Sequence, residues 1–383
     1  MKCGFLEVPF NRFAMMIAPH LLRIARLCGI ACSILLAACT VTQKQDADEA
    51  FKGPLIWPQP PDQPRFAYET VLRSPADIAG TEAPKDKLLR DLAGTEAVSN
   101  QPAFEKPAAV VARNGRIYVS DTATNSIVVF DAPRRKLFRF GMRQPGALSK
   151  PAGLAMDAEM NIYVADTKQR QVMVYDSLGL FQRAVGSPDD LGRPTGVAVS
   201  RDGERIYVID RSDNESNLHQ VVVYGKDGGK IKVIGSRGGG EGQFNVPLQG
   251  AVAADGTLYV LDSGNFRVQA FDRDGNFLRA FGGLGVNPGN LARPRGIAVD
   301  DEGNVYVSDA SFNNFQIFKQ DGQVLLAIGR ASSKSNPGQY GLLNGIAVDE
   351  TGRVYVVDQL FNKVEVFRRL NDKEGQQMLR EAE

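Results

Sequence analysis

A motif that repeats six times between residues 107 and 370 constrains this chain more than any other feature. In each copy a tyrosine stands three residues before an aspartate, within a short apolar run rich in β-branched side chains. The pairs are Tyr118/Asp121, Tyr163/Asp166, Tyr207/Asp210, Tyr259/Asp262, Tyr306/Asp309 and Tyr355/Asp358. Successive tyrosines are 44 to 52 residues apart, a period within the range of propeller blades. The repeat therefore predicts a ring of similar β-sheets.

One copy, residues 247–282, shows what each unit contains. It reads PLQGAVAADGTLYVLDSGNFRVQAFDRDGNFLRAFG, with four strand-sized apolar runs between Gly, Asp and Asn turn residues. Turns this short leave no room for a helix, so each unit is predicted to be a four-stranded antiparallel meander. A single meander buries too little apolar surface to be stable, so the copies must stack against one another.

The number of strands predicts how the ring closes. Copy six ends at residue 370 with three strands, and a lone candidate strand at 65–73 precedes copy one. Pairing that N-terminal strand with the last blade hides an otherwise open edge. The predicted fold is therefore all-β: a six-bladed β-propeller over residues 65–370, with four-stranded antiparallel blades that begin at residue 107.

The repeats resemble NHL repeats, whose fold is a six-bladed β-propeller. The resemblance covers residues 107–370, and blade four keeps the family's Asp-x-x-Asn-x-Arg element as Asp262, Asn265 and Arg267. The other blades depart from that element; blade two, for example, has glutamines at its Asn and Arg positions. The resemblance therefore implies the fold, and no function is carried over from the element.

Residues 1–38 resemble the signal peptide of a bacterial lipoprotein. Arg23 and Arg26 precede an apolar run of about a dozen residues, which is shorter than a membrane span. The run ends in Leu-Ala-Ala directly before Cys39, as a lipobox does. The resemblance implies acylation of Cys39, a membrane anchor at the cell envelope and, because Thr40 follows, an outer-membrane position facing the periplasm. Residues 39–64 are then a lipidated N-terminus and tether.

Cysteine usage and charge narrow the possible functions. All four cysteines lie in the first 39 residues, so the mature chain has no disulfide framework, Cys-based metal site or haem attachment motif. Removing four basic and one acidic residue from totals of 45 and 44 leaves 41 and 43, a net charge of −2. We therefore expect no cofactor and no nucleic-acid partner.

The repeated aspartates are predicted to be structural. Each lies at the end of the second strand of its blade, where a carboxylate can accept backbone N–H groups of the following loop. A position that recurs in every copy indicates a requirement of the repeat itself. A weaker alternative is a cation site in blade three made by Asp210, Asp213 and Glu215, whose spacing does not match a calcium-binding loop.

Basic residues stand beside the proline that opens several blades. In a propeller these connections share one face, at the mouth of the central channel. The sequence therefore suggests a basic collar that binds an anionic ligand or an acidic protein, with ordinary solvated surface as the alternative. The collar candidates are Lys106, Lys150, Arg170, Arg193, Arg267, Arg293 and Arg295, with Lys168, Arg211 and Lys363 on neighbouring loops.

Three functional hypotheses follow. The first is a non-catalytic, lipid-anchored scaffold that binds a protein partner as a monomer or in a hetero-complex; similar NHL-repeat lipoproteins occur with envelope cytochrome systems. The second is a metal-dependent lyase or hydrolase in the channel, although the resemblance implies channel histidines and the mature chain keeps only His219, in an inserted loop. The third is a sensor of small anions or wall components.

Three segments outside the repeat pattern carry further expectations. Residues 76–106 are predicted to be irregular, with a helical turn at 85–93, and residues 371–383 to form a charged tail. The outer strand of blade five, VLLAI at 324–328, carries no Lys or Arg, so we expect 76–106 or a partner to cover that rim. The glycine-rich run at 235–242 is predicted to be a flexible blade connection.

Overall fold

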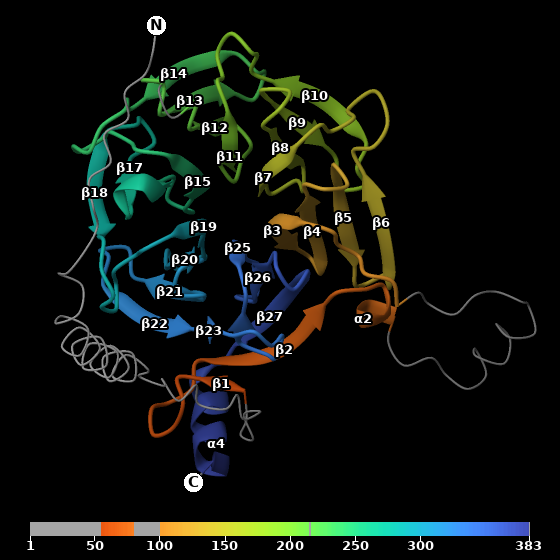
Figure 1. Cartoon of the computed structure of the whole chain (residues 1–383), viewed down its shortest axis with the longest axis vertical. Coiled ribbons are helices and arrows are strands. Elements are labelled where there is room, and N and C mark those ends of the chain that lie inside the picture. Colours follow the sequence, from red (N-terminus) through yellow and green to blue (C-terminus); the bar gives the residue numbers. More distant parts are fainter. Residues whose placement is uncertain (1–54, 80–99, 214–215, 383) are drawn as a thin grey trace, which may run out of the picture. The chain divides into compact units, whose positions relative to one another are not determined.

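The computed structural model describes residues 55–79, 100–213 and 216–382. Within this part of the chain, six β-sheets surround a central axis (Figure 1), which confirms the predicted six-bladed propeller. The predicted signal peptide, Cys39, residues 40–54 of the tether, the helical turn at 85–93 and Glu215 lie outside the described residues.

Blades one to five are each four-stranded antiparallel sheets whose strands follow one another in chain order. Blade one has β3 (Pro107–Arg113), β4 (Arg116–Asp121), β5 (Ser126–Asp131) and β6 (Lys136–Phe140). Blade two has β7 (Pro151–Met156), β8 (Ile162–Asp166), β9 (Gln171–Tyr175) and β10 (Phe181–Val185). Blade three has β11 (Pro194–Val199), β12 (Arg205–Asp210), β13 (Gln220–Gly225) and β14 (Lys230–Ile234).

The next two blades repeat this order. Blade four has β15 (Pro247–Val252), β16 (Leu258–Asp262), a 3₁₀ turn (Ser263–Asn265), β17 (Arg267–Phe271) and β18 (Phe277–Gly282). Blade five has β19 (Pro294–Val299), β20 (Val305–Asp309), β21 (Asn314–Phe318) and β22 (Val324–Ile328). A short parallel pair, β23 (Arg330–Ala331) and β24 (Gln339–Tyr340), lies in the connection to blade six.

Blade six closes the ring with the N-terminal strand, as the strand count predicts. Its C-terminal strands are β25 (Leu343–Val348), β26 (Val354–Asp358) and β27 (Lys363–Arg369). The fourth strand, β2 (Phe66–Leu72), pairs antiparallel with β27, with Tyr68 opposite Phe367. The structure adds a fifth strand, β1 (Ile56–Trp57), which pairs with β2 where the sequence suggested only a tether.

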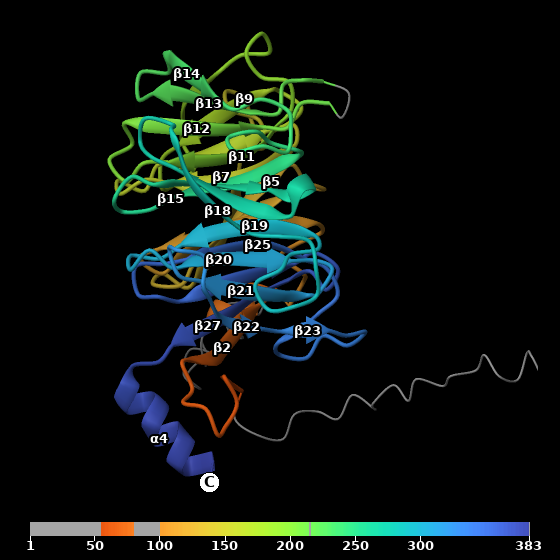
Figure 2. The ribbon, with the colours of Figure 1, turned by 90° about the vertical axis from the view of Figure 1, so that its left-hand side faces the viewer.

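Most of the predicted charged tail forms a helix, α4 (Asp372–Ala382), which the sequence reading did not anticipate (Figure 2). Asn371 caps this helix: its side chain accepts the N–H of Glu374 at 3.0 Å, and Glu374 accepts the N–H of Asn371 at 2.9 Å. Met378 packs against a small cluster of Ile56, Ala67 and Leu370. The helix thus covers the outer side of the closing strand.

The described parts of segment 76–106 lie on blades one and six. A short helix, α2 (Ala76–Ala79), follows β2, and Ile78 and Phe104 belong to the apolar cluster that holds Leu72 and Phe130. No described residue of the segment is placed over the blade-five rim, where Leu325 is 47% exposed.

The core consists of six main apolar clusters, one between each pair of neighbouring blades. The repeated tyrosines lie in these clusters and are at most 3% exposed. Near the axis the blades meet backbone to backbone: a Cβ on Gly153 would lie 2.7 Å from the Cα of Gly196. Glycine at this place lets the inner strands approach closely.

Candidate functional site

Each repeated aspartate fastens two stretches of backbone. All six carboxylates are fully buried, and each accepts a backbone N–H from the segment just before the inner strand of its own blade. In blade five, for example, Asp309 accepts the N–H groups of Ala292 and Arg293 on one side and of Ser311 and Phe312 on the other. The carboxylates are therefore saturated by the fold.

Blade four replaces the loop N–H groups with side chains. Asp262 accepts bonds from Asn265 at 2.8 Å, from Arg267 at 2.9 Å and from Gln269 at 3.1 Å. Burial raises the pKa of Asp262 above its usual value, although these donors oppose the shift. Arg267 and Asn265 also bind carbonyl groups of the glycine-rich run. That run is thus held by hydrogen bonds, contrary to the flexible connection expected.

Two of the collar candidates have structural partners. Arg170 donates to the carbonyl oxygens of Leu191 and Pro188, which lie in the connection from blade two to blade three. Arg267 pairs with the buried Asp262. The neighbouring Lys363 is likewise fully buried and bonds Glu365 at 2.6 Å. Each of these three side chains bonds groups within the fold, which leaves it fewer donors for the collar that the sequence suggests.

Four arginines do come together, and they define what we call the arginine cluster. Arg193 and Arg211 lie on blade three, while Arg293 and Arg295 lie on blade five. Blade four lies between them and contributes the uncharged Val246 at the position of Arg193 and Arg293. Arg295 follows Pro294 at the start of β19. The corresponding residue at the start of β11, Thr195, donates its hydroxyl group to the carbonyl oxygen of Pro247 in the neighbouring blade four. The cluster therefore lies at the strand-start end of the channel.

The positive charges of the arginine cluster repel one another. The pKa of Arg295 is lowered by burial and then by the like charges of Arg293 and Arg211. The pKa of Arg211 is lowered by burial and then by Arg193, while Asp213 opposes the shift. Arg211 also has a buried Nε without a hydrogen-bond partner in the described part of the chain. An anion placed among these guanidinium groups would relieve the repulsion and satisfy the donor.

The remaining candidates lie apart from this cluster. Lys106 and Lys150 are exposed at the starts of blades one and two. His219 is buried in blade three, and its Nδ1 accepts the N–H of Val246 at 3.1 Å, which ties the inserted loop to blade four. Within residues 55–79, 100–213 and 216–382, no three His, Cys, Asp or Glu side chains could together hold a metal ion. The same ranges contain no helix long and apolar enough to span a bilayer.

In the alternative cation site of blade three, the carboxylate of Asp210 is already bonded to backbone groups. The Asp210 carboxylate accepts the N–H groups of Gly192, Arg193 and Ser212. Asp213 is exposed. A buried carboxylate whose oxygens already accept three N–H groups is a poor ligand for a hard cation.

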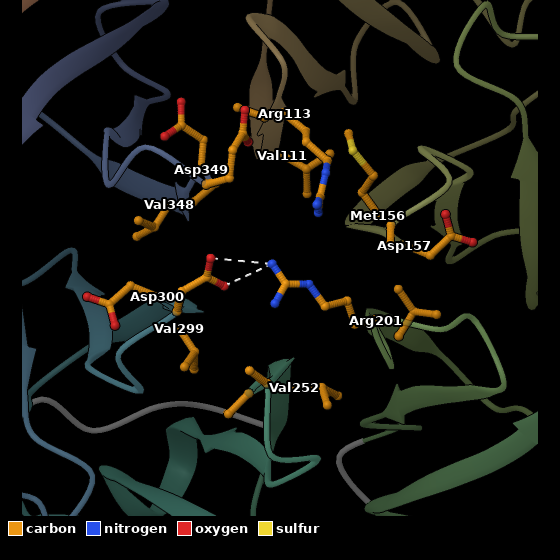
Figure 3. Close-up of a pocket in the computed structure, with 18 residues that line it drawn as sticks. Val111, Arg113, Met156, Asp157, Arg201, Val252, Val299, Asp300, Val348 and Asp349 are labelled. Carbon is orange, nitrogen blue, oxygen red and sulfur yellow. Dashed lines mark hydrogen bonds and ion pairs between the residues drawn. The ribbon is translucent and has the colours of Figure 1, made fainter.

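The opposite end of the channel holds a cavity that the sequence did not single out (Figure 3). It lies where the inner strands end, and all six blades contribute to its lining. Arg113 and Arg201 project into its opening, and Arg201 pairs with Asp301 at 3.1 Å. The sequence signal is an apolar residue near the end of each inner strand, followed two residues later by a position whose charge varies from blade to blade.

Comparison with known proteins identifies the repeats. A model of the NHL repeat matches residues 291–319, which include Arg293, Arg295 and Asp309. The human NHL-repeat-containing protein 4 is 34% identical over 97 residues, which cover 24% of this chain and 72% of that protein. The chain belongs to the NHL-repeat family. The NHL assignment agrees with the six-bladed ring and with the Asp-x-x-Asn-x-Arg element of blade four.

A second NHL relative is much longer than the region it shares. The protein brain tumor of Drosophila melanogaster is 30% identical over 105 residues, 26% of this chain. The match spans only 10% of the length of the fly protein.

Solved structures share the propeller. A Bacteroides thetaiotaomicron protein of unknown function has a TM-score of 0.57 at 16% identity, over 80% of this chain and 76% of that one. A gluconolactonase from Xanthomonas campestris has a TM-score of 0.53 at 19% identity (70% and 87% covered). A streptogramin B lyase scores 0.52 at 13% identity (70% and 95%). At these identities the likeness supports the fold and no activity.

Proposed function

We propose that this NHL propeller is a non-catalytic binding module of a bacterial cell envelope, which docks an acidic protein at the arginine cluster. The observation that supports it most is the group of four guanidinium groups from blades three and five. They repel one another, and no carboxylate in the described residues forms an ion pair with any of them. Arginine binds carboxylates through paired N–H donors, so an acidic patch on a partner supplies what the cluster lacks.

The fold suits this role because it presents the cluster on a rigid frame. Arg193 and Arg293 have their backbone N–H groups bound to Asp210 and Asp309 at 2.6 Å and 2.9 Å. The guanidinium groups are thus displayed from fixed points, which reduces the ordering cost of binding. The mature chain carries no haem motif, so a place in a cytochrome-associated complex, proposed by analogy, would be that of a scaffold.

Crosslinking in intact cells tests the docking site. One variant changes Arg193, Arg211, Arg293 and Arg295 to Gln, and the control changes Lys136, Arg143, Lys226 and Lys319 to Gln, which removes the same charge elsewhere. We expect the wild type and control to crosslink an acidic protein through peptides of the cluster, and the cluster variant to lose it. An unchanged crosslink in the cluster variant would contradict the proposal. Stabilisation by phosphate or organic acids without a protein crosslink would favour the sensor hypothesis.

We also propose that lipid on Cys39 anchors the module to the membrane. The basis is the lipobox-like sequence that ends at this residue. Cells labelled with a radioactive fatty acid should yield a labelled, membrane-bound protein. The Cys39→Ser variant should carry no label and leave the membrane fraction. Equal labelling of both proteins would exclude Cys39 as the attachment point.

A further inference from the structure

The cavity at the strand-end mouth of the channel has an apolar wall. Its volume is about 180 Å³. One apolar side chain from each inner strand forms a ring around it: Val111, Met156, Val199, Val252, Val299 and Val348. Five of the six are partly exposed, and only Val199 is buried. An apolar ring that remains accessible gains free energy when an apolar group covers it.

A second ring, two residues further along the chain in each blade, forms the rim. Its members in blade order are Arg113, Ala158, Arg201, Ala254, Asp301 and Glu350. The two cations come from blades one and three, and the two acids come from blades five and six. Blades two and four supply alanine, which leaves the opening unfilled between the charged side chains.

The acidic groups around the mouth already have partners. The carboxylates of Asp157, Asp300 and Asp349 accept the hydroxyl groups of the tyrosines on the next strand, at 3.0, 3.0 and 2.8 Å. Glu350 accepts the N–H of Asn114 at 2.8 Å. Asp301 pairs with Arg201. Hydrogen bonds from neutral groups leave a carboxylate charged, so Glu350 keeps a negative charge on the rim. Arg113 is the rim cation whose side chain has no hydrogen-bond or ion-pair partner among the described residues, so its guanidinium group is available to the carboxylate of a ligand.

Arg201 is also available to a ligand. Its pair with Asp301 is half-exposed, with side-chain exposures of 50% and 59%. Exposed ion pairs of this kind contribute little to stability, so a ligand can replace Asp301 at little cost. Figure 3 shows the side chains of Arg113 and Arg201 both projecting into the opening.

We propose that this mouth binds a small amphiphilic carboxylate, whose head pairs with Arg113 and Arg201 and whose apolar body covers the valine ring. The cavity volume of about 180 Å³ suits a small ligand, and a chain of about six carbon atoms is a reasonable probe of it. Two guanidinium groups and one carboxylate form strong, directional bonds in such a partly enclosed site. The site is separate from the arginine cluster and independent of the docking proposal.

Calorimetry with a defined probe tests this inference. The full-length chain carrying Cys39→Ser avoids acyl chains in the sample. Hexanoate is the probe, and hexylammonium and hexan-1-ol are the head-group controls. We expect hexanoate to bind, both controls to bind at least about tenfold more weakly, and Arg113→Gln to weaken hexanoate about tenfold. Val252→Phe, which fills the cavity, should abolish binding.

Matched variants keep the outcome decisive. Arg330→Gln removes an exposed arginine from β23, outside the cavity lining, and should leave hexanoate affinity unchanged. Arg113→Gln changes a half-buried surface group, so it tests the site even if Val252→Phe fails to fold. The inference is overturned if hexanoate does not bind at millimolar concentration. It is equally overturned if hexylammonium binds as well as hexanoate, or if Arg113→Gln and Arg330→Gln have the same effect.

Discussion

The carboxylate of Asp309 accepts the backbone N–H of Arg293 at 2.9 Å, across sixteen residues of sequence. The same carboxylate accepts the N–H of Ser311 at 2.8 Å in the next loop. A repeated structural residue thus fixes the backbone from which a blade-specific side chain extends. This explains how a binding cluster can differ from blade to blade while the frame beneath it stays the same.

Replacing Asp309 with Asn should destabilise the propeller. The amide has one acceptor oxygen in place of two, so buried N–H groups lose their partner at a cost of about 3 kcal/mol in unfolding free energy. Asp272→Asn is the control, because Asp272 makes the analogous turn bonds to Asn276 in an exposed loop. Urea unfolding should show a large shift for the first variant and almost none for the second. Equal shifts would mean that the buried carboxylate has no special role.

A buried tyrosine hydroxyl should contribute to the stability of the propeller only where it has a hydrogen-bond partner. Tyr355 donates to Asp349 at 2.8 Å, whereas the buried hydroxyl of Tyr224 has no partner among the described residues. Tyr355→Phe should therefore lower the unfolding free energy by about 1.5–3 kcal/mol, the range for bonds to charged groups. Tyr224→Phe should be neutral or slightly stabilising. A larger loss for Tyr224→Phe in thermal or urea unfolding would contradict this assignment.

Alkaline pH should weaken the closing strand through Tyr68. Burial, and then the negative charge of Glu365, raise the pKa of Tyr68 to about 12. The unfolded chain loses this proton near pH 10 and the folded chain keeps it, so the stability contributed is complete below pH 10 and is lost as pH rises to about 12. The difference in unfolding free energy between the wild type and Tyr68→Phe should fall across that window. A difference that is constant from pH 9 to 12 would show that the Tyr68 pKa is not raised.

The buried pair of Lys363 and Glu365 should show strong coupling in a double-mutant cycle. Both side chains are at most 1% exposed, and Lys363 also donates to the Gln339 carbonyl at 3.0 Å. Glu365→Gln leaves the ammonium group without its counter-charge and should cost about 3–5 kcal/mol. The double variant Lys363→Met/Glu365→Leu should cost less than the single change, because no unpaired charge remains. Additive losses in urea unfolding would argue against the pair.

The fold was predictable because it depends on local patterns. Tyr-x-x-Asp at a fixed period, short Asp-Gly turns and a count of strands were enough to predict six blades and their closure by β2. Two features at the closure were missed. The two-residue strand β1 is too short to show periodicity, although Asn371 and Glu374 do form a recognisable capping box before α4.

The candidate site was predictable only in part, because side-chain partners are set by tertiary contacts. Arg170, Arg193 and Arg267 look alike in sequence, since each stands on a loop at the same face. The carbonyl groups that accept hydrogen bonds from Arg170, and the carboxylate that pairs with Arg267, come close to them only in the folded chain. The ring that contains Arg113 and Arg201 was missed because its members are 43 to 53 residues apart and differ in charge.

A photo-crosslinking residue introduced at Arg293 tests the central claim most directly. This position is exposed on blade five, within the arginine cluster. In cells it should form an adduct with an acidic protein, and the adduct should disappear when Arg193, Arg211 and Arg295 are changed to Gln. The same photo-crosslinking residue at Arg330, on β23 between blades five and six, should not form it. An adduct that survives loss of the other three arginines, or that forms equally from position 330, would contradict docking at the cluster.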